Sequence, residues 1–539
     1  MNNTERPNNV PDNGKEETAS HLFFLDRKTI EFTQSDSRIT KTKSLPITYV
    51  EQNYSSTTVP LSLSSDQNGD SFIVSNCTFI NCSNSQSSGG AIYSSISNGA
   101  IVSFDETQFI DCYCVNEGGA IFITVTSGSE VHFESCSMNN CFSAKNGGGL
   151  YILILSSYAE TAAYLSNLYI QNCSCYWHGG GIYIDARDNV ALSLIGEFMF
   201  DKCSSVGENF NGGGICIEMS NPQQSIHMEG DYTFFNCSSE LQGGGMYIAA
   251  NEQKPILINC NCLFQNCTST SGGGMLISYW GSGDLTQLGG NFTFESCNAQ
   301  LFGGGLFIES ASNGFVQIDD FTFLECSSRS GGGIFWSLVK DSKQIINRGQ
   351  FNYCYTTMYG GGISVQFSSN SELILNNSCL FFKCNCLGCG GAIYANINYN
   401  LPFQFNISDS AVYECLAEHN PYQAQYQSGF GGGIFLTGNG DYDPSTESLD
   451  FRGMNINLNF ADYGGQSLYV VMPNLIQFCQ SGIAGEYIKG NYSDKYSDYE
   501  EIEGIQADQI TFNSLSLEQI EHISHLKLIR YQLAIINQP

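Results

Sequence analysis

The sequence predicts an all-β fold, a right-handed parallel β-helix of about 13 turns with three short strands per turn. Three observations support this prediction. A Phe-x-x-Cys-like phrase recurs along most of the chain, a glycine run follows each phrase at the same period, and the segments between them are short and alternating or rich in β-branched residues. A unit of about 30 residues is too small to bury its own apolar face, so each unit must stack on its neighbours.

The cysteines of the recurring phrase define the repeat. Twelve of them are separated by 28 to 34 residues: Cys82, Cys112, Cys141, Cys173, Cys203, Cys237, Cys267, Cys297, Cys326, Cys354, Cys384 and Cys415. A thirteenth, degenerate copy, INLNFADYGGQSLYV, has Asn459 where the others have cysteine. This regularity indicates one stacked array rather than a series of independent domains.

A single unit, Gly243 to Ser271, shows the three predicted strands. It contains the segments GGGMYIAA, NEQKPILINCN and CLFQNCTSTS, separated by polar turns and without a helical stripe. Crossovers between parallel strands are right-handed in nearly all proteins, so we expect a right-handed coil. The glycine run is expected at the corner of each turn, where the backbone takes a tight or positive-φ path and the next turn stacks closely.

Two columns of side chains follow the glycine runs. The first residue after the glycines is apolar in every turn, as Ile182 and Met275 illustrate, and it is predicted to face the core. Strand alternation turns the next residue outward. That residue is aromatic in nine of twelve turns: Tyr93, Phe122, Tyr151, Tyr183, Tyr247, Phe307, Phe335, Tyr394 and Phe435. These aromatic side chains either stabilise neighbouring strands by stacking, or form an exposed stripe that binds a glycan, a protein partner or another copy of the chain.

The cysteines are predicted to be buried free thiols. Stacked turns place neighbouring Cα atoms about 4.8 Å apart, within reach of a disulfide, but parallel stacking points their Cβ atoms in the same direction. Four cysteines could hold a zinc ion, although no second pair at regular spacing supports that interpretation: Cys379, Cys384, Cys386 and Cys389.

An acidic loop resembles a calcium-binding loop. Its oxygen-bearing residues are Asn439, Asp441, Asp443, Glu447 and Asp450. Pro444 stands where a calcium loop needs glycine, so an acidic turn between strands is the favoured interpretation. We expect no metal and no cofactor.

The segments FINCSNSQSSGGAIY, FIDCYCVNEGGAIF and FFKCNCLGCGGAIY resemble the repeats of polymorphic outer membrane proteins (Pmp), which are surface adhesins and autotransporter passengers. The resemblance covers about residues 72 to 470. Cysteine replaces the asparagine of that family, and no C-terminal membrane barrel follows, so it implies a eukaryotic, protist relative rather than an autotransporter. It also implies a cell-surface or secreted location, although the sequence shows neither a signal peptide nor a spanning segment.

Charge limits the partners. The chain has 21 basic and 52 acidic residues and a formal net charge of −31, which disfavours nucleic acid and anionic lipid. The predicted function is a non-catalytic, adhesin-like or structural binding protein that presents an extended β-helix face to glycans or protein partners. Self-association is possible in principle, and no membrane insertion is expected.

The alternative function is a carbohydrate-active enzyme, either a polysaccharide lyase or a glycoside hydrolase. Asp185 and Glu218 occupy the same outward position on consecutive turns, and Glu309 follows three turns later. Two neighbouring carboxylates can serve as acid and nucleophile on a glycosidic bond. The Asn-Thr-Asp and Gly-His-Gly signatures of pectinases are missing, however, and basic residues that would hold an acidic sugar are sparse.

The repeat does not extend to the ends of the chain. We predict a polar, largely disordered segment over 1–55, the β-helix over 56–479, an acidic linker over 480–510 and a short C-terminal helix over 511–539. The helix is amphipathic, with its apolar face formed by Ile520, Ile523, Leu526, Ile529, Leu533 and Ile536. It either covers the last open turn or belongs to a following domain.

Overall fold

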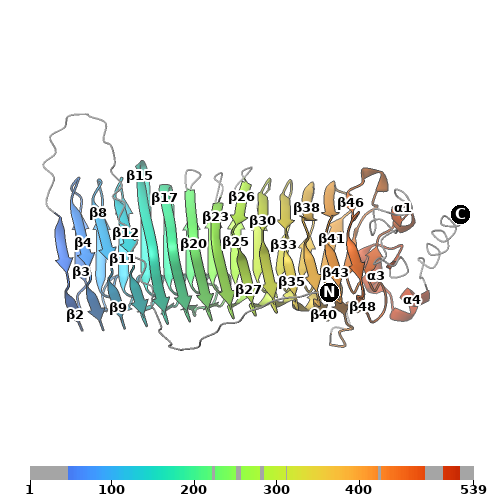
Figure 1. The fold of residues 1–539 in the computed structure, drawn as a ribbon, viewed down its shortest axis with the longest axis horizontal. Helices are drawn as coiled ribbons and strands as arrows, with labels where there is room; N and C mark the ends of the chain where they lie inside the picture. The colour runs from blue at the N-terminus through green and yellow to red at the C-terminus, as the bar shows by residue number, and fades with distance from the viewer. Residues whose placement is uncertain are drawn as a thin grey trace, which may run out of the picture. The chain divides into compact units, whose positions relative to one another are not determined.

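The computed structural model describes residues 46–220, 225–250, 256–279, 285–310, 312–422, 426–479 and 502–522. All of these residues belong to one compact unit, Ser44–Pro539. They form a right-handed parallel β-solenoid of about 13 turns with three strands per turn, which confirms the predicted fold class. Figure 1 shows the strands of successive turns side by side in one stack.

Three columns of strands run through the stack. The first column, which follows the glycine runs, contains β3 (Leu61–Ser65), β7 (Ile92–Ile96), β11 (Ile121–Thr126), β19 (Ile215–Met219), β22 (Met246–Ala250), β25 (Met275–Tyr279), β29 (Leu306–Ser310), β33 (Ile334–Ser337), β37 (Ile363–Gln366), β41 (Ile393–Asn398), β45 (Ile434–Asn439) and β49 (Leu468–Val471). The second contains β1 (Ile47–Val50), β4 (Ser71–Ser75), β8 (Ile101–Asp105), β12 (Glu130–Glu134), β26 (Leu285–Gly289), β30 (Phe315–Asp319), β34 (Lys343–Asn347), β38 (Ser371–Asn376), β42 (Phe403–Ile407) and β46 (Leu449–Asp450). The third contains β2 (Asn53–Ser55), β5 (Thr78–Ile80), β9 (Gln108–Ile110), β13 (Ser137–Asn139), β27 (Phe292–Glu295), β31 (Phe321–Leu324), β35 (Gln350–Asn352), β39 (Leu380–Phe382), β43 (Ala411–Tyr413) and β47 (Asn455–Asn457).

Some strands run through more than one column. The strands β15 (Leu150–Gln171) and β17 (Ile182–Asp201) span all three columns, whereas β20 (Ser225–Phe235) and β23 (Ile256–Gln265) span the second and third. A separate parallel sheet of 13 short strands follows the cysteines: β6 (Ser83–Asn84), β10 (Tyr113–Cys114), β14 (Phe142–Ser143), β16 (Ser174–Cys175), β18 (Ser204–Ser205), β21 (Ser238–Ser239), β24 (Thr268–Ser271), β28 (Asn298–Phe302), β32 (Ser327–Ser330), β36 (Tyr355–Tyr359), β40 (Asn385–Cys386), β44 (Leu416–Ala417) and β48 (Phe460–Ala461). Because β1 and β2 pair with β4 and β5, residues 47–55 already belong to the stack.

The glycine runs form backbone corners, as the sequence indicated. Gly272 has a φ of +65°, a conformation that glycine adopts without steric cost. A Cβ atom on Gly273 would overlap the carbonyl oxygens of Gly304 and Asn298 in the following turn. The amide of Gly273 donates a hydrogen bond to the carbonyl of Gly303 at 3.1 Å, so the corners of adjacent turns are bonded directly through their backbones.

A stack of aromatic rings fills the core behind the third strand column. Successive rings lie 4.6 to 4.9 Å apart between centroids and are nearly parallel along Phe200, Phe234, Phe264, Phe294, Phe323, Phe351 and Phe381. All seven side chains are fully buried. Each such pair contributes about 0.5–1.5 kcal/mol beyond the burial of its area.

The cysteine column closes the corner after the third strand. Every cysteine whose side chain the structure describes is a buried free thiol, which confirms that prediction. The thiol of Cys267 donates to the carbonyl of Phe234 in the preceding turn at 3.5 Å. In the degenerate repeat, the amide Nδ2 of Asn459 donates to the carbonyl of Val412 at 3.0 Å. Thiol and amide therefore perform the same task, which is to satisfy a buried carbonyl of the turn before.

Short helices pack near the C-terminal end of the stack, where Figure 1 shows them in orange and red. They are α1 (Leu475–Cys479), α3 (Gln509–Ser514) and α4 (Leu517–His522), accompanied by the strand β50 (Ile502–Ile505) and the 3₁₀ helix η1 (Pro444–Thr446). Phe478 of α1 packs against Tyr442, with ring centroids 5.5 Å apart, and joins the central core. The strand β50 pairs with β49 and lies within the predicted linker. None of the described helices is long and apolar enough to cross a membrane.

The predicted C-terminal helix is described only in part. Ile520 is buried in α4, whereas Ile523, Leu526, Ile529, Leu533 and Ile536 lie outside the described residues. Phe512 of α3 packs on the outer face of the first strand column, with ring centroids 5.9 Å from both Phe435 and Tyr469. Among the described helices, α3 thus covers an outer face, while α1 contributes to the core at the last turn.

We predict that Gly273→Ala strongly destabilises the stack, because its Cβ would overlap backbone atoms that side-chain rotation cannot move. The expected loss in the free energy of unfolding is at least about 3 kcal/mol. Gly289→Ala is the matched control, since its Cβ would meet its nearest neighbour at an ordinary 3.4 Å, and it should change the value by less than about 0.5 kcal/mol. Urea unfolding followed by circular dichroism measures both, and equal stability of the two variants would contradict the corner packing.

Candidate functional site

The predicted aromatic stripe points away from the central core but is largely covered. Tyr151, Tyr183, Tyr247, Phe307, Phe335, Tyr394 and Phe435 are only 2–9% exposed, while Tyr93 and Phe122 are half-buried. Of the two interpretations of this column, the exposed stripe is therefore wrong for seven of its nine members. These side chains instead form apolar clusters of their own outside the central core.

In several turns the cover includes an aromatic residue that directly precedes the glycine run. Phe302 lies with its ring centroid 4.4 Å from that of Phe335, and Tyr359 lies 4.3 Å from Tyr394. Towards the C-terminal end, Phe512 of α3 adds to this cover. Ring stacking between neighbouring turns, such as 5.5 Å between Tyr93 and Phe122, agrees with the stabilising interpretation of the column.

A pocket opens on this outer face across the turns that begin with β17, β19 and β22. It has a volume of about 530 Å³ and is lined by Tyr183, Asp185, Arg187, Glu218, Met219, Ser220, Tyr247 and Ala249. The residues before the glycine runs of these turns are His178, Asn211 and Gln242, all of them polar. The structure thus brings Asp185 and Glu218 together in one pocket, as their shared strand position indicated, and pairs them in register on adjacent turns.

Both pocket carboxylates are held by neighbours. Asp185 is 7% exposed and receives two hydrogen bonds from Arg187, at 2.9 Å from Nε and 2.5 Å from Nη2. These hydrogen bonds raise the pKa of Arg187 above its ordinary value, so the guanidinium stays charged. Oε2 of Glu218 accepts a hydrogen bond from the hydroxyl of Tyr183 at 2.8 Å. Burial, reinforced by the charge of Glu218, raises the pKa of Tyr183, so the phenol remains a donor.

His178 and Cys216 lie next to Glu218, on the side of its Oε1 atom. Nδ1 of His178 lies 3.9 Å from Oε1 of Glu218, and the thiol of Cys216 lies 4.0 Å from the same oxygen. The amide of Asn211 donates to Nδ1 of His178 at 3.2 Å. Burial lowers the pKa of His178 and raises the pKa of Cys216, so the pair consists of a neutral imidazole and a thiol.

Sequence reasoning missed His178, Arg187 and Cys216. One signal was available for Cys216, because it interrupts the aromatic column two residues before Glu218. Glu309, the third carboxylate of that column, does not line the pocket and accepts a hydrogen bond from Ser278 at 3.3 Å.

Exposed aromatic side chains adjoin the pocket. We name Tyr176, Trp177 and Phe210 the aromatic patch; Tyr176 is 52% exposed and Trp177 is 39% exposed. The rings of Trp177 and Phe210 stack at 5.7 Å, and Phe210 meets the ring of His178 edge-on at 5.1 Å. His178 in turn stacks on Tyr183 at 5.7 Å, so a continuous series of rings joins the patch to the pocket.

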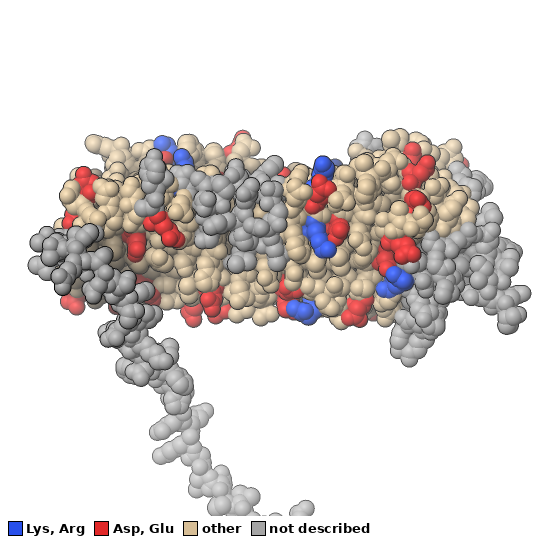
Figure 2. Space-filling view, turned by 90° about the horizontal axis from the view of Figure 1, so that it is seen from above, with Lys and Arg blue, Asp and Glu red and all other residues tan. Residues whose placement is uncertain are grey.

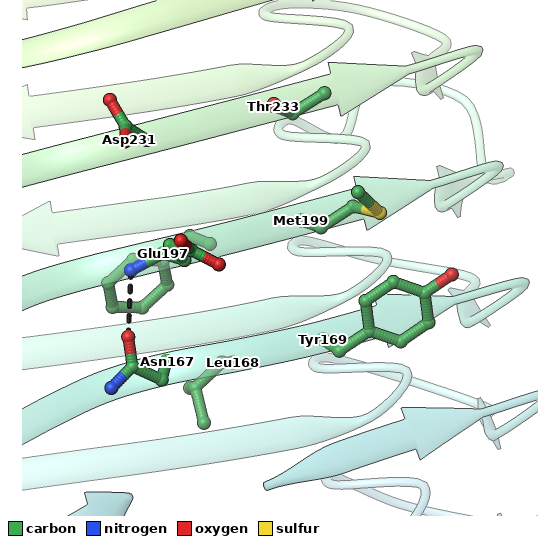
Figure 3. A pocket seen from close by; sticks show the side chains of 8 residues that line it. Asn167, Leu168, Tyr169, Glu197, Met199, Asp231 and Thr233 are labelled. Carbon is green, nitrogen blue, oxygen red and sulfur yellow. Dashed lines mark hydrogen bonds between the residues drawn. The ribbon is translucent and has the colours of Figure 1, made fainter. Parts of the chain in front are cut away.

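A second, smaller pocket lies on the third strand column. Figure 3 shows its side chains, which come from β15, β17 and β20. It has a volume of about 260 Å³ and is lined by Asn167, Leu168, Tyr169, Glu197, Phe198, Met199, Asp231 and Thr233. Oδ1 of Asn167 accepts a hydrogen bond from the amide of Glu197 at 2.9 Å. Tyr169 and Met199 provide an exposed apolar surface there, whereas the larger pocket contains more charged groups.

The two metal motifs considered from the sequence form ordinary structure. Thiols of the proposed zinc cluster donate to backbone carbonyls, as Cys379 does to Ile346 and Cys386 does to Cys389. In the acidic loop, Asp443 accepts from the amide of Ser445 to cap η1, and Asp450 pairs with Arg452 at 2.7 Å, in agreement with an acidic turn.

No protein-family model, curated protein or solved structure matches the chain. The likeness to Pmp repeats therefore rests on the repeated sequence phrases alone.

We predict that Phe335→Ala lowers the free energy of unfolding by about 3–5 kcal/mol, because Phe335 is buried in the outer aromatic column. Tyr176→Ala removes a ring that is 52% exposed and should cost less than about 1 kcal/mol. Urea unfolding of the two variants measures the difference. A small cost for Phe335→Ala would show that the column is open to solvent.

Proposed function

We propose that the protein is a non-catalytic binding protein, adhesin-like in its role, that binds a carbohydrate at the larger pocket and the adjoining aromatic patch. The observation that carries the proposal is the series of rings from Trp177 through Phe210 and His178 to Tyr183, which ends at the charged groups of the pocket. The resemblance to Pmp repeats, whose members include surface adhesins, supports the same role.

The chemistry of this region suits a sugar. The carbon–hydrogen faces of pyranose rings pack on exposed aromatic rings such as Trp177, and such side chains contribute large contact area at binding sites. Sugar hydroxyls both donate and accept hydrogen bonds, and the pocket offers Asp185 and Glu218 as acceptors with Arg187 as a donor.

The charge distribution favours neutral over acidic glycans. Figure 2 shows acidic side chains outnumbering basic ones on the face in view, in line with the net charge of −31. Arg187, the basic group that lines the pocket, is already paired with Asp185. A sulfated or uronic acid polymer would therefore meet repulsion at most of the surface.

A carbohydrate-active enzyme is the second candidate. It is favoured by the in-register pairing of Asp185 and Glu218 within one pocket, since two carboxylates on either side of a glycosidic bond are the groups that glycosidases use. Both candidates place a saccharide in the same pocket, so they differ in whether the bond is cleaved.

We predict that Trp177→Ala weakens binding of neutral oligosaccharides at least ten-fold, about 1.4 kcal/mol, because it removes the exposed ring beside the pocket. A glycan array identifies the oligosaccharide, and isothermal titration calorimetry measures the affinity. Tyr422→Ala is the matched control, because Tyr422 is 93% exposed and lies far along the chain, and it should leave the affinity unchanged. Absence of any glycan binding by the wild-type chain would contradict the proposal, and equal affinity of both variants would place the ligand elsewhere.

We predict further that the wild-type chain releases no reducing ends from neutral or acidic polysaccharides. Asp185→Asn and Glu218→Gln should retain the fold and weaken oligosaccharide binding through loss of charged hydrogen bonds. A reducing-sugar assay of the three proteins provides the measurement. Release by the wild type that both variants abolish would replace the binding function with the enzyme.

A further inference from the structure

We propose that His178, Cys216 and Glu218 form a binding site for one divalent transition-metal ion, with zinc as the best match. Each residue offers one donor atom, and the three atoms lie within 4.8 Å of one another. Among the described residues, no other group of three or more His, Cys, Asp or Glu side chains meets this condition. A nitrogen, a thiolate and a carboxylate oxygen are the three ligand types that zinc takes in proteins.

The fold explains why these residues meet. Cys216 and Glu218 are separated by one residue on β19, so strand alternation directs both side chains to the same face. His178 stands immediately before the glycine run of the preceding turn, and β17, which follows that run, pairs in register with β19. Cys216 also occupies a place in the column that holds an aromatic residue in nine of twelve turns, where a ring would fill the space of an ion.

The distances are close to those that zinc requires. With bonds of about 2.0–2.3 Å in a tetrahedral arrangement, neighbouring donor atoms lie about 3.5 Å apart. The separations from Oε1 of Glu218 are 3.9 Å to Nδ1 of His178 and 4.0 Å to the sulfur of Cys216. These two separations exceed the ideal value by about half an ångström, and the third pair of donor atoms lies within 4.8 Å. Adjustment of the side-chain rotamers would bring the donors to bonding distance.

Neighbouring groups already orient the donors. The hydroxyl of Tyr183 holds Oε2 of Glu218, which leaves Oε1 directed at His178 and Cys216. The backbone amide of His178 donates a hydrogen bond to Oδ1 of Asn146 at 3.0 Å, which fixes the backbone just before the glycine run. Nδ1 of His178 accepts a hydrogen bond from the backbone amide of Asn211 at 3.2 Å, so this nitrogen carries no proton and has a lone pair to donate. A bound ion would replace that hydrogen bond. Partners of this kind orient metal ligands in known sites.

The site would have one open position. Three protein ligands leave the fourth tetrahedral position of zinc to water or another ligand. The side chains of His178 and Glu218 are 22% and 35% exposed, and Glu218 lines the larger pocket, whereas Cys216 is fully buried. A thiolate, a carboxylate and a neutral imidazole would balance the charge of the ion. Metal binding does not depend on the carbohydrate proposal, because every donor belongs to the chain itself.

Zinc titration of the full chain tests the proposal. After treatment with EDTA and dialysis, the wild type should bind one zinc ion per chain with micromolar or tighter affinity in competition with a chromophoric chelator. His178→Ala, Cys216→Ser and Glu218→Gln should each weaken that binding at least ten-fold. Cobalt added in place of zinc should give a thiolate charge-transfer absorption that Cys216→Ser abolishes.

Two variants serve as matched controls. His227→Ala removes the histidine of an exposed His–Glu pair on β20, with His227 and Glu229 3.5 Å apart, and Cys297→Ser removes a buried thiol from the cysteine column. Both should bind zinc as the wild type does.

Circular dichroism checks that each variant is folded. If Cys216→Ser does not fold, the variants of the partly exposed residues His178 and Glu218 still test the site. Absence of stoichiometric zinc in the wild type, or zinc affinities of the three donor variants equal to that of the wild type, would overturn the metal site. Neither outcome bears on carbohydrate binding, which is measured without metal.

Discussion

The close approach of one backbone to the next at the glycine corners is the constraint on which the rest of the structure depends. At Gly273 the space that a Cβ would fill already holds the carbonyl oxygens of Gly304 and Asn298. Direct hydrogen bonds between successive corners, such as that from Gly244 to Gly272 at 3.2 Å, fix each turn relative to the next. With the register fixed there, every later position in a turn lies over the equivalent position of its neighbour.

Columns of like side chains follow from that register. Apolar rings stack in the core, thiols satisfy carbonyls of the preceding turn at the corner before each glycine run, and a second set of rings packs on the outer face. The proposed sites lie where such a column is interrupted. Cys216 replaces a ring of the outer column, and the pocket with its carboxylates opens at the same turns. The regular columns stabilise the stack, and the residues of the proposed binding and metal sites lie where the columns are interrupted.

The sequence predicted the solenoid because its determinants recur at a fixed period. Glycine is required at positions such as Gly273, and the cysteines mark the corner before it, so both are visible without a structure. The exposure of the aromatic column could not be predicted, because its cover comes from residues such as Phe302 and Tyr359 in a segment that varies from turn to turn. His178 lies in the same variable segment, so its approach to Glu218 was equally hidden. Asp185 and Glu218 were found because they share a strand position that the period makes recognisable.

Hydrogen–deuterium exchange of the glycine-run amides tests the central claim most directly. If the corners are bonded backbone to backbone, the amides of Gly244 and Gly273 should exchange as slowly as those of the adjoining strands β22 and β25, because all of them open only when neighbouring turns separate. Mass spectrometry of peptides that cover Gly243–Gly245 and Gly272–Gly274 provides the measurement. Exchange at the rate of an unstructured peptide in these segments, with the strands still protected, would show that the glycine runs are loose loops and would contradict the account.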